Sequence, residues 1–218
     1  MTTPDPRATF AVLPRAAFLA LPLLGCASTP AGAPATRTWS VTVLGDSSDP
    51  RFEAVVEATQ YWNRELEAVG VPLRFGSVSS SPRRAPEAEL RYLRLRGLHR
   101  DRVERPRFLA GIRGNVVVAF SSSPDLRSVG IRPDLLGGQG LVVLRPADVL
   151  PLAAPNVARN VAAHELGHVL GLPHNSQPGT LMCMRTRGCG SGRYRADSVA
   201  FFPLTDAERE RLRRRWRP

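Results

Sequence analysis

The histidines of this chain are concentrated in one short run, where residue types and spacing suit metal chemistry. Residues 164–174 read His-Glu-Leu-Gly-His-Val-Leu-Gly-Leu-Pro-His and hold three of the four histidines of the sequence. On a helix, residues four apart share a face, so His164 and His168 can direct their imidazoles at one point. Three neutral imidazoles with a fourth position left to water are typical of a catalytic zinc site rather than a closed structural one.

Two further features of this run complete the zinc interpretation. Gly171 can adopt the backbone conformation that ends a helix, after which the chain can bring His174 back to the same point. Glu165 leaves the helix beside His164, close to a water on the metal but not obliged to bind the metal itself. We therefore expect one zinc ion on His164, His168 and His174, with Glu165 as the general base.

The stretch that follows carries a family resemblance. Met182 stands eight residues after His174, in Gly-Thr-Leu-Met-Cys-Met. Together with the histidine run it resembles the metzincin metallopeptidases, whose signature is H-E-x-x-H-x-x-G-x-x-H followed by a methionine turn, and among these the matrixin type. The resemblance implies a zinc-dependent endopeptidase with a protein or peptide substrate, in which Met182 forms an apolar floor and binds no metal. A chance H-E-x-x-H in an ordinary helix is the alternative.

The sequence also departs from the matrixin pattern. Val142 and Val143 stand where the family carries histidines for a second, structural zinc, and His99 is interpreted as a surface residue. Calcium sites stay unassigned, although Asp134 is a candidate by position alone. The residues after Met182 are Cys-Met-Arg, so the usual wall of the specificity pocket is not expected. No cysteine-switch propeptide of the matrixin kind is present in the sequence.

The first residues of the sequence indicate export. Residues 16–24 form an apolar stretch, preceded by arginines, that is too short to span a bilayer. The Leu-Leu-Gly-Cys that ends at Cys26 resembles the lipobox of bacterial lipoproteins. We expect a signal peptide over residues 1–25, a lipid on Cys26 and a flexible tether over residues 26–38. We therefore expect the exported protein to be anchored to a membrane, at the outer membrane or in the periplasm or at the cell surface. Ordinary secretion is the alternative.

Two cysteines remain beyond the lipobox, Cys183 and Cys189. Export to an oxidising compartment and an even count favour a disulfide between them. A free Cys183 that ligates or quenches the zinc is the alternative.

Composition limits the remaining functions. The 218 residues, 43% of them hydrophobic, are enough for one domain, which we place at residues 39–218 and expect to be monomeric. The net charge is +11 and all basic residues are arginine. No aromatic-interleaved motif accompanies them, so a solvated basic surface is expected rather than nucleic-acid binding. A catalytically inactive zinc-binding lipoprotein and an Arg-rich module for anionic polymers remain as alternatives, and the latter leaves the histidine run unexplained.

Hydrophobic periodicity predicts the elements that position the histidines. Strands are expected at residues 39–44, 72–78, 89–95, 116–120 and 141–144. Asp49 is expected to cap a first helix that starts at Pro50, and Asn156 to cap a second helix that carries the histidines. A capping box at Thr205 opens the last helix.

This order predicts an α+β fold, layered as α/β and similar to the metzincins. It has a twisted mixed sheet with an antiparallel edge strand, two long helices, a methionine turn and a C-terminal helix. We expect residues 141–145 to lie at the edge and to pair with an extended substrate.

Overall fold

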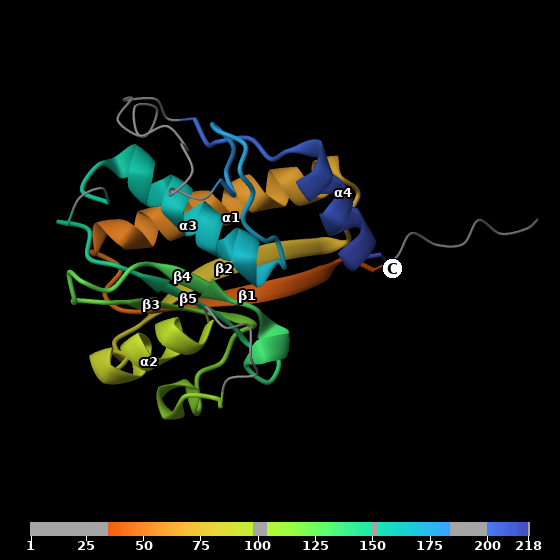
Figure 1. Ribbon diagram of the computed structural model, residues 1–218. Helices are drawn as coiled ribbons and strands as arrows, with labels where there is room; N and C mark the ends of the chain where they lie inside the picture. The colour runs from red at the N-terminus through yellow and green to blue at the C-terminus, as the bar shows by residue number, and fades with distance from the viewer. Residues whose placement is uncertain (1–34, 98–103, 150–151, 184–199, 218) are drawn as a thin grey trace, which may run out of the picture. The chain divides into compact units, whose positions relative to one another are not determined.

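A five-stranded mixed sheet organises the fold (Figure 1). The structure is a computed structural model that describes residues 35–97, 104–149, 152–183 and 200–217. The strand order is β2-β1-β3-β5-β4, in which β4 is antiparallel to β5 and all other pairs are parallel. The strands are β1 (Arg37–Leu44), β2 (Leu73–Ser81), β3 (Val116–Phe120), β4 (Val129–Ile131) and β5 (Gly140–Leu144).

Helices cover both faces of this sheet. They are α1 (Pro50–Ala68), α2 (Glu87–Gly97), α3 (Pro155–Val169) and α4 (Asp206–Arg215), with 3₁₀ turns η1 (Arg107–Leu109) and η2 (Pro133–Leu135). Alternate residues of β3 face opposite sides, since Val116 and Val118 join the core with α1 and α3 while Val117 and Ala119 join the core with α2. Figure 1 shows α2 on the face opposite to α1 and α3. The predicted fold class is confirmed.

The helix α1 forms as its sequence predicts and is tied to α3. The carboxylate of Asp49 accepts a hydrogen bond from the backbone N–H of Arg51 at 2.9 Å, and Pro50 occupies the first turn. Trp62 has no exposed surface, and its indole N–H donates to the carbonyl of Ala163 in α3 at 2.8 Å. This buried hydrogen bond fixes α1 against the helix that carries the histidines.

The strand expected at residues 89–95 is wrong, because this segment forms α2. Leu90 and Leu93 are fully buried, three residues apart, whereas Tyr92 and Leu95 are exposed, which is the spacing of a helix rather than the alternation of a strand. Leu90 N–H donates to the carbonyl of Pro86 at 3.1 Å at the start of the helix. Packing of the two leucines against the sheet therefore outweighs the weak alternation in the sequence.

The expected edge strand at residues 141–145 is also wrong. β5 lies between β3 and β4, and all five of its residues are buried, as an interior strand requires. The antiparallel edge is the three-residue β4, which is too short to stand out in a sequence.

Of the two other predicted helix caps, one is wrong and one is confirmed. The N-cap of α3 is Ala154 rather than Asn156, and Asn156 instead accepts a hydrogen bond from the side chain of Asn160 at 3.3 Å. The capping box at Thr205 is confirmed, with Glu208 as its second member. Among the described helices, none is both long and apolar enough to cross a membrane.

Candidate metal centre

The helix α3 presents two of the predicted ligands on one face. His164 and His168 lie four residues apart on it, while Leu166 and Val169 point into the core with at most 1% of their surface exposed. The helix ends where the sequence predicts, because Gly171 has φ of +98°. A Cβ at this glycine would stand 2.6 Å from the movable side chain of Arg215, and L side chains rarely adopt this φ, so a larger residue would strain the backbone here.

The chain beyond this turn brings the third histidine to the other two. The Nε2 atom of His174 lies 3.1 Å from Nε2 of His164 and 3.0 Å from Nε2 of His168. The three side chains form a group that could hold a metal ion. Ligand nitrogens on a tetrahedral zinc stand roughly 3.3 Å apart, close to the distances seen here.

Backbone carbonyls fix the protonation of the two helical histidines. Nδ1 of His164 lies 2.7 Å from the carbonyl of Leu181, and Nδ1 of His168 lies 2.8 Å from the carbonyl of Leu172. Because a carbonyl only accepts, each Nδ1 carries the proton and each Nε2 keeps its lone pair. Both Nε2 lone pairs are directed at Nε2 of His174, so three imidazole nitrogens converge on one point and the donor set fits a zinc ion.

Burial keeps His164 in the form that binds metal. It lowers the pKa of His164 to about 4, against the hydrogen bond to Leu181, which raises it, and together with the neighbouring His174, which lowers it. The imidazole is therefore neutral at neutral pH, as a metal ligand must be.

Glu165 lies where α3 meets the edge strand. Its side chain is buried, and this burial raises the pKa of Glu165 to about 8, although a hydrogen bond from the backbone N–H of Gly130 in β4 opposes the shift. A Cβ at Gly130 would collide with the backbone carbonyl of Glu165 and would stand 2.9 Å from Cβ of His168. Burial therefore favours the neutral form of this carboxyl group at pH 7.

Sequence reasoning missed this contribution of Gly130. The glycine is 35 positions from Glu165, and neither its neighbours nor its spacing distinguishes it from other glycines of the chain.

Met182 lies under the histidine-bearing helix. It has no exposed surface, and its sulfur would stand 2.6 Å from a Cβ at Gly167, the residue just before His168. The carbonyl of Met182 also accepts a hydrogen bond from the backbone N–H of Asn175 at 2.9 Å. This position agrees with an apolar floor beneath the histidines.

The structure describes some of the other predicted site residues and not others. Cys183 is disulfide-bonded, whereas Cys189, Cys26 and His99 lie outside the described residues. Asp134, the calcium candidate, forms ion pairs of 3.1 Å with Arg132 and 3.7 Å with Arg215. Val142 and Val143 are both buried within β5.

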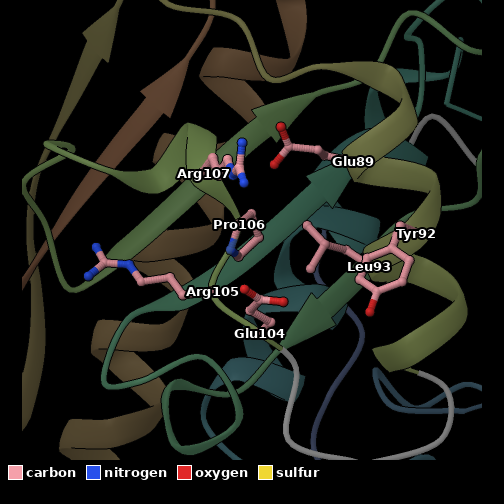
Figure 2. Close-up of a pocket in the computed structure, with 7 residues that line it drawn as sticks. All are labelled: Glu89, Tyr92, Leu93, Glu104, Arg105, Pro106 and Arg107. Carbon is pink, nitrogen blue, oxygen red and sulfur yellow. The ribbon is translucent and has the colours of Figure 1, made fainter.

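A cavity of about 360 Å³ lies away from this centre. Figure 2 shows side chains of α2 and of the segment before and within η1 around it. Leu93 in its lining belongs to the core on the α2 face of the sheet, opposite to α3. The cavity is therefore separate from the histidines. Its lining consists of Glu89, Tyr92, Leu93, Glu104, Arg105, Pro106 and Arg107.

Comparison with known proteins supports the resemblance drawn from the sequence. The matrixin family matches residues 146–198, which include the three histidines, Glu165 and Met182. Among solved structures, archaemetzincin from Methanopyrus kandleri matches with 17% identity over 85% of this chain and 97% of that chain, at a TM-score of 0.44. Comparison with curated proteins gives no match. The family match confirms the predicted matrixin resemblance for residues 146–198.

Proposed function

Because residues 146–198 match the matrixin family, we propose that this chain is a zinc-dependent endopeptidase with His164, His168 and His174 as ligands. The observation that carries the proposal is the convergence of the three Nε2 atoms at 3.0 and 3.1 Å. The buried carboxyl group of Glu165 follows directly after the first of these ligands. This combination matches what hydrolysis by an activated water needs.

In this proposal the three histidines hold the metal ion and Glu165 transfers a proton. A zinc ion held by the three imidazoles would lower the pKa of a bound water to about 7 and polarise the scissile carbonyl, and its positive charge would favour the ionised form of Glu165. His164 and His168 hold their rings in place through Nδ1–H bonds to Leu181 and Leu172. Glu165 takes the proton from the attacking water and later gives it to the leaving amine.

The edge strand β4 is the proposed site of substrate pairing. It ends the sheet on the side of α3, and its Gly130 N–H reaches Glu165. An extended peptide added along Val129–Ile131 would gain main-chain hydrogen bonds beside the proposed general base. This mode tolerates many sequences, so it does not define a cleavage preference.

The test combines metal analysis with peptide hydrolysis. Replacing any one of the three histidines by Ala should lower bound zinc well below one ion per chain. Glu165→Ala should keep the zinc and lose casein cleavage by about 10²- to 10⁴-fold or more, since proton transfer alone contributes that much. Full zinc in all three histidine variants would contradict the ligand set. Zinc without hydrolysis in the wild type would leave a zinc-binding protein instead of an enzyme.

We also propose that the protein is a lipoprotein anchored through Cys26. The motif at residues 23–26 supports this, and the residues themselves lie outside the described part of the structure. Metabolic palmitate labelling should mark the wild type and not Cys26→Ser, whereas an unlabelled, soluble wild type would indicate ordinary secretion.

The partner of Cys183 is proposed to be Cys189. Alkylation without reduction should then leave both thiols unmodified in exported protein.

A further inference from the structure

The three histidines are held in different ways. His164 and His168 project from α3, whose backbone fixes their spacing. His174 is exposed and belongs to no helix or strand, and it follows the turn at Gly171. The position of its Nε2 therefore depends on what holds the chain just after it.

Asn175, the next residue, is the anchor of this segment. Its side-chain amide donates to Oε1 of Glu208 at 2.6 Å and approaches the hydroxyl of Thr180 at 2.9 Å. Its amide oxygen accepts from the backbone N–H of Gln177 at 2.8 Å, and its own backbone N–H donates to the carbonyl of Met182. One side chain thus connects the third histidine, the methionine turn and the C-terminal helix.

Glu208, which accepts this hydrogen bond, uses its two carboxylate oxygens for two separate interactions. Its Oε2 accepts from the backbone N–H of Thr205 at 2.8 Å and completes the capping box of α4. Its Oε1 is not needed for the cap and accepts from Asn175 instead. Glu208 is only 5% exposed, so this carboxylate lies in a site where each oxygen requires a donor.

We propose that Asn175 and Glu208 are positioning residues that hold His174 in its metal-binding place. The hydrogen bond between them makes the start of α4 a support for the third ligand. This inference rests on the proposed zinc site and concerns how the chain forms it. Removing a residue that holds a metal-binding side chain in place typically changes the metal affinity by roughly 10- to 100-fold.

The experiment is a zinc titration of the metal-free, full-length protein against a chromophoric chelator. Glutamine has one acceptor oxygen where glutamate has two, so Glu208→Gln cannot accept from both Asn175 and Thr205. Glu208→Gln and Asn175→Ala should each raise the Kd for zinc by roughly 10- to 100-fold. Because both variants remove the hydrogen bond between Asn175 and Glu208, the double variant should bind zinc no more weakly than the weaker of the two single variants.

Two controls separate positioning from simple loss of helix stability. Glu210→Gln makes the same chemical change in α4 at a surface carboxylate that pairs only with Arg213 and Arg214 among the described ion pairs, and it should leave the Kd unchanged. Thr205→Ala weakens the cap without removing Asn175 or Glu208, so it should lower Tm but not zinc affinity. Circular dichroism of the metal-free variants checks that each is folded.

The inference is overturned if Glu208→Gln and Asn175→Ala bind zinc as tightly as the wild type. It is also overturned if Thr205→Ala weakens zinc binding as much as Glu208→Gln does. A wild type that binds no zinc would instead contradict the proposed function itself. The two failures are therefore distinguishable in the same titration.

Discussion

The two edge strands of the sheet satisfy their outward backbone groups in different ways. At β2, the side chain of Asn63 in α1 donates to the carbonyl of Phe75 at 2.8 Å and accepts from its N–H at 2.7 Å. At β4, the N–H of Gly130 donates to the carboxylate of Glu165 in α3. One edge is thus closed by the side-chain amide of Asn63, and the other is joined to the proposed general base.

The sheet therefore has a covered edge at β2 and, at β4, an edge that contacts the proposed general base. A free edge strand is open to pairing with other chains, and proteins commonly cover it. Asn63 provides that cover over part of β2, which is nine residues long. β4 has three residues, and its glycine permits the close approach to α3 that places Glu165. Variants at the two edges should therefore separate stability from catalysis.

The largest effect is expected from Gly130→Ala. The added methyl group would collide with the backbone of Glu165, so β4 or α3 must shift and the hydrogen bond to the carboxylate weakens. Because a misplacement of about 1 Å can cost about 100-fold in rate, kcat/KM for a peptide substrate should fall by about that factor. Steady-state kinetics of folded variant protein measures it, and an unchanged kcat/KM would remove β4 from the proposed site.

Asn63→Ala should act on stability instead. It leaves the N–H and carbonyl of Phe75 without their partner, so the free energy of unfolding should fall by about 1–3 kcal/mol. The opened edge should also promote self-association, whereas kcat/KM of the folded monomer should stay the same. Urea unfolding and light scattering measure the two effects. Asn63→Asp keeps the acceptor but sets a carboxylate oxygen against the carbonyl of Phe75, so it should be destabilised as well. A catalytic defect in Asn63→Ala would contradict the comparison.

A smaller, pH-dependent effect is expected at Asp49, which supports the strands between the two edges. Burial alone would raise the pKa of Asp49, but hydrogen bonds from the side chain and backbone of Arg51 and its positive charge lower it below the usual 3.8. Arg51 in turn donates to the carbonyls of Ser121 and Leu144, beyond β3 and at the end of β5.

Because the folded pKa is the lower one, the stabilisation by ionised Asp49 is complete above pH 3.8 and is lost as the pH falls through the folded pKa. Asp49→Asn keeps a capping side chain but removes the charge. The stability difference between the wild type and Asp49→Asn should therefore shrink in acid, by about 1 kcal/mol or less. Urea unfolding at a series of pH values tests this, and a constant difference would contradict the assignment.

The smallest effect is expected from Gly76→Ala in β2, the counterpart of the change at Gly130. Its Cβ would lie 3.0 Å from Cγ2 of Thr38, a side-chain atom that can move. Alanine is favoured over glycine in a strand by about 0.5–1 kcal/mol, which offsets the contact. Stability should change by less than about 1 kcal/mol and kcat/KM not at all. A rate defect like that of Gly130→Ala would show that both edges serve catalysis.

The sequence by itself determined the part of the site that depends on local geometry. The spacing of His164 and His168 fixes their common face once a helix forms, and Gly171 ends that helix as predicted. The cap at Asp49 and the capping box at Thr205 were also predictable, because each satisfies backbone N–H groups within a few residues.

Tertiary structure alone decided the features that join distant segments. The contact of Gly130 with Glu165 and the hydrogen bond of Asn175 to Glu208 each span more than thirty positions, and no local pattern encodes them. The same reason explains the errors at α2 and β5. Burial of Leu90 and Leu93 against the sheet selects a helix, and the addition of β4 beyond β5 turns an expected edge into an interior strand. Short-range propensity is a weak determinant when long-range packing favours another structure.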